Sequence, residues 1–221
     1  GPSRPFELNW LEGSLVVNNW KSKGSIDLQS GAVRAIGYEG NLKLWLQSGI
    51  ARLQNYKGSL YFKSYKAKVF LENSEGDVEL DNFMGQSQVT EFKGDINLES
   101  RLGQVKVSKG EGKLDFKLGR AKINIDNFDG SIRGKSGQGQ VTGVLKGDVD
   151  VRVRTDEGSV NLKLPRSGAQ LDLGTKEGDF RVPSFLKLTR YSFIKVVKGR
   201  LRGPSRGNVF VRTKSGSIKI R

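Results

Sequence analysis

The sequence predicts an all-β protein folded as a parallel β-solenoid, and two regularities carry this prediction. Glycine returns every nine residues: from Gly31 to Gly139, thirteen consecutive nine-residue units begin with glycine or alanine. The third and fifth positions of these units are mostly apolar, as in Val78 and Leu80, whereas the second and fourth are mostly polar. Such alternation is typical of a strand with one buried face, and glycine suits the turn that follows each strand.

Stacking explains how strands this short could be stable. A single unit cannot bury its apolar side alone, but successive coils bury a continuous core and pair with the coils above and below. The fixed period disfavours a β-sandwich, whose turns are irregularly spaced, and right-handed winding is expected by analogy with parallel crossovers. Aromatic residues 27 positions apart, at Tyr38, Tyr65 and Phe92, favour three units per coil. Tyr38 and Tyr56 lie 18 apart, which leaves two units per coil open.

The nine-residue frame loosens at both ends. Residues 1–12 are interpreted as a tag scar, Gly1-Pro2-Ser3, followed by an N-terminal lead-in, and residues 13–221 as a single β-solenoid domain. Beyond Gly147 the glycine spacing stretches, and a basic excursion at about 181–206 precedes two closing strands. No change in composition along the chain indicates a second domain.

Composition excludes several kinds of chemistry. The chain has 221 residues, 35% of them apolar, with no cysteine and no histidine. Disulfides and thiol chemistry are therefore absent, as are the commonest general base and the commonest transition-metal ligand. No apolar run approaches the length of a membrane-spanning helix.

Charge is distributed unevenly. The formal net charge is +15, and the stretch from Arg181 to Arg221 contains twelve Lys or Arg and no acid. Basic strips that include aromatic residues bind phosphates, acidic glycans or anionic lipid head groups. The expected partner is an anionic glycan, an anionic membrane surface or an envelope protein, with nucleic acid less favoured. The candidate partner-binding residues are Arg181, Lys187, Arg190, Lys195, Lys198, Arg200, Arg202 and Arg206.

The sequence gives weaker evidence for a metal site or for a catalytic site. Calcium-binding β-rolls need an aspartate in every turn, but acids do not recur at the sixth position of the units, so no metal or cofactor is expected. Asp77, Asp95, Asp148 and Asp179 follow glycine at equivalent positions and could line one face, as in glycan-active β-helix enzymes. However, Gly-Asp is also a common start to a strand, so these aspartates need no catalytic role. The protein is therefore predicted not to be an enzyme.

Recurrent asparagines before the turns are expected to form stacked ladders, as in other solenoids. They are Asn55, Asn73, Asn82 and Asn127.

The last third of the chain resembles a known family. "TDEGSVNL" at residues 155–162, Leu164-Pro165, and "SGSIKI" at residues 215–220 are similar to motifs of the bacterial putative-adhesin (auto-transporter-adhesin-like) family of glycine-rich domains. The resemblance covers residues 76–221 best. It implies a β-solenoid on an exported or envelope-attached protein, with no catalytic residues to transfer. Bactofilins, polymerising β-solenoids of the bacterial cytoskeleton, are a second and weaker resemblance.

Together these observations predict a non-enzymatic, adhesin-like interaction module of the bacterial cell envelope, in the periplasm or on the outer surface, with a cytoplasmic location also open. The first alternative is a self-assembling, bactofilin-like scaffold, because Ile218 and Ile220 lie on the last strand, whose edge is expected to be uncovered. The second alternative is a glycan-active β-helix enzyme.

Overall fold

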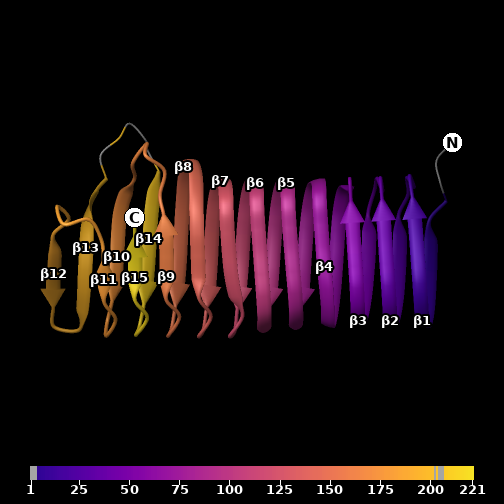
Figure 1. The fold of residues 1–221 in the computed structure, drawn as a ribbon, viewed down its shortest axis with the longest axis horizontal. Helices are drawn as coiled ribbons and strands as arrows, with labels where there is room; N and C mark the ends of the chain where they lie inside the picture. Colours follow the sequence, from indigo (N-terminus) through magenta and orange to yellow (C-terminus); the bar gives the residue numbers. More distant parts are fainter. Residues whose placement is uncertain (1–3, 202, 204–206) are drawn as a thin grey trace.

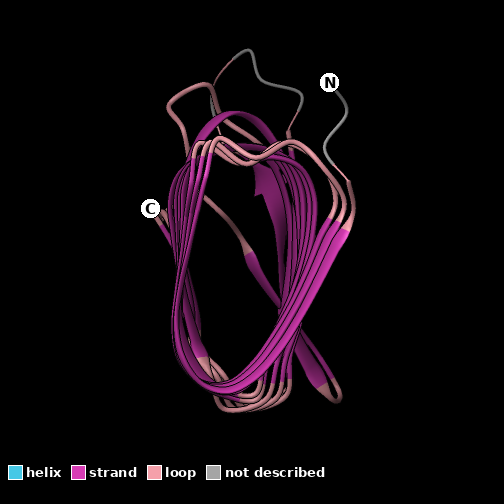
Figure 2. Cartoon of the chain, turned by 90° about the vertical axis from the view of Figure 1, so that its right-hand side faces the viewer, coloured by secondary structure: helices cyan, strands magenta, loops and turns pink. Residues whose placement is uncertain are grey.

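The chain forms the expected solenoid. The computed structural model describes residues 4–201, 203 and 207–221, and these build an all-β parallel β-solenoid of about nine turns with about 18 residues per turn. Figure 1 shows the strands stacked side by side along the long axis. The view along that axis in Figure 2 shows a flattened coil with two long walls joined by bends. The tag scar expected at Gly1-Pro2-Ser3 lies outside the described residues.

Eight long strands follow one another in chain order through the first part of the solenoid. They pair in parallel, each with the next. They are β1 (Phe6–Asn18), β2 (Gly24–Ile36), β3 (Leu42–Gln54), β4 (Lys57–Asn82), β5 (Met84–Ser100), β6 (Leu102–Leu118), β7 (Lys122–Ser136) and β8 (Val141–Thr155). Because β1 pairs with β2 from Phe6 onward, the solenoid begins earlier than the boundary at residue 13 that the sequence suggests.

Each coil contains two nine-residue units, not the three that the aromatic spacing favours. Leu44 is in register with Ile26 of the coil before it and with Phe62 of the coil after it, so each coil advances the chain by two units. The ring of Tyr38 stacks on that of Tyr56, 5.7 Å away, in one bend. Tyr65 stacks on Phe83 at 5.3 Å. The longer spacing, from Tyr38 to Tyr65, spans one and a half coils and therefore connects residues on opposite sides of the coil.

The core lies between the two walls and follows the predicted pattern. The third and fifth residues of every unit from Val33 to Gly143 are buried. Each unit contributes one wall, so that Leu44 and Phe62 belong to one wall while Leu53 and Leu71 belong to the other. The expected asparagine ladder is confirmed for one step, since the Asn73 side-chain amide donates to Asn55 Oδ1 at 2.6 Å. Asn82 instead donates to the Ala67 carbonyl oxygen at 3.0 Å, and Asn127 lies three coils beyond Asn73.

The recurring glycine fills a position where a side chain does not fit. Gly94 has a φ of +132° and lies against Gly76 of the preceding coil. A Cβ at Gly94 would lie 3.0 Å from the carbonyl carbon of Gly76 and would overlap its carbonyl oxygen. Alanine replaces glycine only at Ala67 and Ala121, and neither of these has a positive φ. The nine-residue glycine period is therefore a requirement of coil-to-coil contact.

Chain order changes after β8. The remaining strands are β9 (Val160–Lys163), β10 (Gln170–Thr175), β11 (Phe180–Arg181), β12 (Leu188–Tyr191), β13 (Ile194–Arg200), β14 (Asn208–Thr213) and β15 (Ile218–Ile220). β14 pairs in parallel with β8 on one side and with β10 on the other. β15 lies between β9 and β11. The last coil of the chain is thus inserted between two coils formed by earlier residues (Figure 1).

This insertion corrects the expectation of an uncovered last strand. Ile218 and Ile220 are 0% and 2% exposed, and β15 has a strand on each side. The end of the solenoid is formed instead by the basic excursion. Its strand β13 pairs antiparallel with β10, and β12 pairs antiparallel with β13. Val197 of β13 is fully buried, so the excursion covers part of the core.

Candidate functional site

The structure distributes the predicted basic residues over the terminal strands. Arg181 lies on β11, Lys187 precedes β12, Arg190 lies on β12, and Lys195, Lys198 and Arg200 lie on β13. Arg202 and Arg206 lie outside the described residues.

Two of these cations already have acidic neighbours. Lys195 Nζ donates to the Gly178 carbonyl oxygen at 2.9 Å and lies 3.3 Å from Asp179 Oδ1. Lys198 Nζ is 3.9 Å from Asp172 Oδ2. Lys187 and Arg190 are exposed and form no ion pair with any described residue.

A second basic group, on the wall of the solenoid, is not evident from the sequence. We call it the coil-face cluster: Arg133 and Lys135 of β7 with Arg152 and Arg154 of β8. Arg133 is in register with Arg152, and Lys135 with Arg154. Neighbouring strands are roughly 4.8 Å apart and residues two apart along a strand roughly 6.6 Å, so four cations share a small rectangle. All four are exposed, and none forms an ion pair with a described residue.

The cluster continues onto the inserted strand β14. Phe210 is in register with Arg152, and Arg212 with Arg154. The guanidinium carbon of Arg212 lies 4.1 Å from the centre of the Phe210 ring, and those of Arg152 and Arg154 lie 5.7 and 5.8 Å from it. Cation–π contacts of this kind hold the guanidinium groups in place. A groove of about 330 Å³ runs along the cluster from Asn97 to Arg154.

Arg212 differs from its neighbours because it is neutralised. It donates to Asp172 Oδ1 at 2.7 Å and to the Asp172 carbonyl oxygen at 2.8 Å. The unpaired positive charge therefore concentrates on the four residues of the coil-face cluster.

At several other positions the solenoid places opposite charges next to each other on adjacent coils, although Arg34 and Arg52 are in register, as are Asp77 and Asp95. Lys21 pairs with Glu39 at 2.7 Å, and Lys109 with Glu91 at 2.7 Å. Lys117 pairs with Glu99 at 2.8 Å. In each pair the two partners lie one coil apart. Like charges directly opposite on neighbouring strands are destabilising, so the coil-face cluster departs from the arrangement that favours stability.

A smaller basic group lies on the opposite wall. Arg181 is in register with Lys219, and Arg221 follows on the same strand end. Burial lowers the pKa of Lys219, and the charges of Arg221 and Arg181 lower this pKa further. This group brings the predicted residue Arg181 together with two cations of the closing strand.

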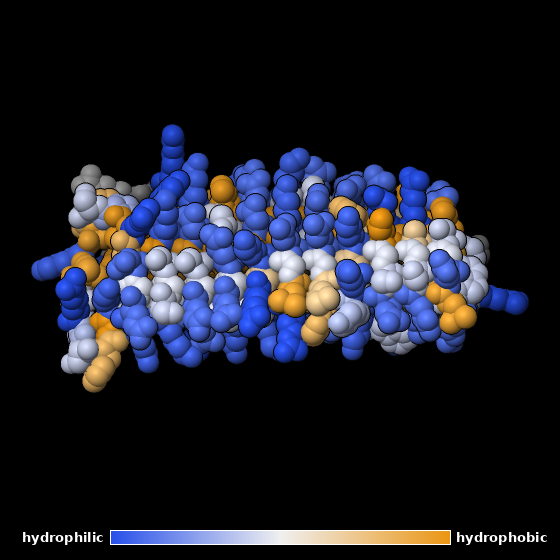
Figure 3. All heavy atoms as spheres, turned by 60° about the horizontal axis from the view of Figure 1, so that its bottom comes forward, coloured by the Kyte–Doolittle hydropathy of each residue, from blue (hydrophilic) through white to orange (hydrophobic). Residues whose placement is uncertain are grey.

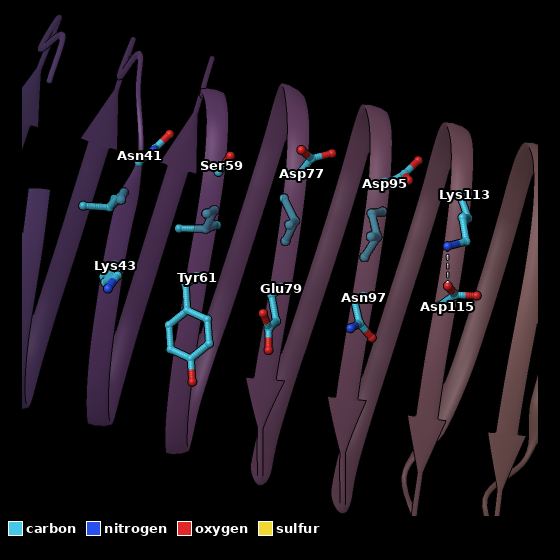
Figure 4. A pocket seen from close by; sticks show the side chains of 14 residues that line it. Asn41, Lys43, Ser59, Tyr61, Asp77, Glu79, Asp95, Asn97, Lys113 and Asp115 are labelled. Atoms are coloured by element: carbon cyan, nitrogen blue, oxygen red, sulfur yellow. Dashed lines mark ion pairs between the residues drawn. The ribbon is translucent and has the colours of Figure 1, made fainter. Parts of the chain in front are cut away.

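An acidic groove lies on the same wall as the coil-face cluster, nearer the N terminus. It encloses about 610 Å³ and is lined by two rows of side chains from successive coils (Figure 4). Asp77 and Asp95 are in register, as the sequence suggests, and Lys113 follows them. Lys113 Nζ lies 2.8 Å from Asp115 Oδ2, and a hydrogen bond from Lys113 to Asp115 is the main cause of a raised Lys113 pKa.

Two acids proposed for this row do not join it. The next residues in register after Lys113 are Ser131 and then Asp150, because a bulge between β7 and β8 displaces Asp148. Asp179 directly precedes β11, which belongs to the opposite wall. The expected line of four aspartates is therefore wrong beyond Asp95. The groove that does form can exchange hydrogen bonds with a polar chain laid across the coils.

Comparison with known proteins yields no relative. No family model matches the sequence, and no curated protein or solved structure matches it significantly. Within the described part of the chain, no group of three or more acidic side chains could hold a metal ion. Over the same residues, no helix has the length and apolar character needed to cross a membrane.

Proposed function

We propose that this protein is a non-enzymatic interaction module of the bacterial cell envelope that holds an acidic polymer on its coil-face cluster. The supporting observation is that Arg133, Lys135, Arg152 and Arg154 lie side by side on two coils and form no ion pair with a described residue. Asp115 lies opposite Arg133 on β6, but its ion pair is with Lys113. At other positions, such as Lys21 and Lys109, a cation on one coil is paired with a glutamate on the adjacent coil. Four unpaired like charges raise the free energy of the unliganded protein, and a bound polyanion would offset this.

An extended polymer fits the shape of this surface better than a compact anion does. The cations lie in rows across parallel strands, and both strands belong to a wall with a regular repeat. Arg152 and Arg154 can form forked hydrogen bonds with carboxylate or sulfate groups. The exposed Lys187 and Arg190 extend the positive surface to the end of the molecule.

An acidic glycan is favoured over nucleic acid. Sequence-tolerant binding of single-stranded nucleic acid relies on aromatic faces on which bases stack. Phe210 is the aromatic residue of this surface, and three guanidinium groups already lie against its ring. The envelope location rests on the resemblance of residues 76–221 to adhesin-like domains, and fractionation of cells that express the full-length gene product would test it.

Titration at low salt with an acidic glycan, such as a polyuronate, tests the proposal. Replacing Arg133, Lys135, Arg152 and Arg154 by glutamine should weaken binding at least about tenfold and reduce its salt dependence, because fewer counterions are released. The matched control replaces four exposed lysines on earlier coils, Lys43, Lys57, Lys66 and Lys68, by glutamine. Equal losses in both variants would mean that only net charge matters and that the coil-face cluster is not a site.

A second candidate function is self-assembly through the N-terminal coil. Leu8 and Trp10 are in register with Ile26 and Leu28, which are 1% exposed, yet Trp10 is 47% exposed. β1 pairs with β2 alone, so within the described part of the chain no strand covers its other edge. Light scattering over a concentration series would reveal a larger assembly, and Trp10→Lys should shift it toward monomer.

A further inference from the structure

We propose that the hairpin formed by β12 and β13 inserts its turn into the interfacial region of an anionic lipid bilayer. This inference does not depend on the coil-face cluster. It rests on the aromatic pair at the turn, Tyr191 and Phe193, which we call the tip pair, and on the cations beside it.

The tip pair is unusually exposed. Phe193 is 84% exposed and Tyr191 is 64% exposed. Phe185 and Leu188, at 61% and 42%, lie within the same short stretch. Single exposed apolar residues are common on soluble proteins, but a group of them marks an interaction surface. Figure 3 shows hydrophobic side chains at this end of the solenoid, with further groups of them along the coil and at the N-terminal end.

Local structure gives no reason for these aromatics. Tyr191 pairs with Ile194, so Ser192 and Phe193 form the turn of a tight hairpin. Turns of this length normally use glycine, asparagine or aspartate, which stay hydrated. Neither Ser192 nor Phe193 has a positive φ, so the backbone permits a phenylalanine but does not require one. All four residues of β12 are exposed, and this strand pairs only with β13. The phenylalanine therefore contributes nothing to the core that would explain its presence.

The charges around the tip pair suit an anionic surface. Lys187 and Arg190 are exposed and form no ion pair with a described residue, whereas Lys195 of β13 is paired with Asp179. Basic residues near a membrane are attracted to anionic head groups. Tyrosine and phenylalanine bury their rings at the boundary between head groups and acyl chains, and tyrosine keeps its hydroxyl hydrated there.

A bilayer fits this feature better than a folded macromolecule does. The tip pair lies on a hairpin turn at the end of the molecule opposite the N terminus (Figure 1). The grooves described above contain no residue of 185–193. A protein or nucleic acid partner would have to supply a pocket of matching shape for a projecting ring, whereas a fluid bilayer closes around it.

Fluorescence of a Phe193→Trp variant would measure insertion directly. With vesicles of phosphatidylcholine and phosphatidylglycerol, and with the wild-type signal subtracted, emission from the introduced indole should shift to shorter wavelength and be quenched by brominated acyl chains. Vesicles of phosphatidylcholine alone should give much weaker binding. In co-sedimentation, the double variant Tyr191→Ser/Phe193→Ser should bind anionic vesicles about tenfold or more weakly, because two rings no longer leave water.

Control variants separate the possible outcomes. Leu11→Ser removes a residue of similar exposure, 73%, at the opposite end and should leave vesicle binding unchanged. The glutamine variant of the coil-face cluster, combined with Phe193→Trp, should retain the emission shift, which distinguishes this inference from the proposed function. An unshifted indole emission, or a double variant that binds as well as the wild type, would overturn insertion. Tip-dependent binding to a soluble glycan or to nucleic acid in place of vesicles would overturn it also.

Discussion

The tightest contact between coils predicts the effect of a single methyl group. In Gly94→Ala, the new Cβ would overlap the carbonyl oxygen of Gly76 and lie 3.0 Å from its carbonyl carbon. Both atoms belong to backbone that is fixed by pairing of β4 with β5, so neither can turn aside as a side chain would. Alanine would also have to adopt the φ of +132° that Gly94 has.

The expected loss of unfolding free energy in Gly94→Ala has two parts. An unfavourable φ for a residue with a Cβ costs about 1–3 kcal/mol. Relieving the overlap requires the coils to separate by about 1 Å, which lengthens two or three neighbouring hydrogen bonds beyond the usual 3.2 Å, and each such bond contributes about 1 kcal/mol. The free energy of unfolding should therefore fall by about 3–6 kcal/mol.

Gly13→Ala is the control that separates these two parts. Gly13 has a φ of +154° but no atom within 4 Å of the position that a Cβ would take. Gly13→Ala should therefore lose only the free energy that results from the unfavourable φ, about 1–3 kcal/mol. Urea unfolding followed by circular dichroism measures both, and the comparison uses the midpoints because solenoids need not unfold in one step. Equal midpoints for Gly94→Ala and the wild type would show that the coils are not in this contact.

Three further predictions test the core, the charges and the turns. Leu80→Ala, at a site that is 1% exposed, should cost about 2–5 kcal/mol in urea unfolding, whereas Lys106→Ala on the outer surface should cost under about 0.5 kcal/mol; equal losses would contradict the inward pattern. Burial is the main cause of the raised pKa of Asp81, so the folded state holds this proton more tightly than the unfolded state does, and stability falls as pH rises through that pKa. Asp81→Asn should therefore raise the unfolding midpoint at neutral pH and leave it unchanged in acid. Calcium or a chelator should leave the melting temperature unaltered, and a calcium-dependent rise would indicate ligands in the turns.

The sequence predicts the coil well because the physical constraint repeats in every unit. At most of the glycine positions a side chain would overlap the backbone of the preceding coil, and residues such as Val78 and Leu80 must face inward, so nearly every unit has the same pattern. The number of units per coil is harder to predict. Aromatic residues stack in both bends of the coil, Tyr38 on Tyr56 in one and Tyr65 on Phe83 in the other. The 27-residue spacing from Tyr38 to Tyr65 therefore compares residues in different bends and does not give the length of a coil.

The coil-face cluster is hidden in the linear sequence for a related reason. Arg133 and Arg152 belong to different strands, and only the two-unit coil with its bulge places them side by side. Counting charged residues along the chain instead locates the excess positive charge after Arg181. In the structure some of these cations have acidic neighbours, as Lys195 has in Asp179. The sequence also does not predict where the closing strands are inserted. β14 lies between β8 and β10, but its alternation of apolar and polar residues is the same as in every other strand.

The inserted coil also bears on how the chain is assembled during translation. From β1 to β9, each strand can join the stack as it leaves the ribosome, since its neighbour has already been made. β10 cannot join in this way, because its partner toward the N terminus is β14, which is synthesised later. The segment from 170 to 200 must wait beside an incomplete stack until residues 208–220 arrive and fill the space between. Vectorial growth from the N terminus thus gives way, in the last layers, to a closure step that joins both parts at once.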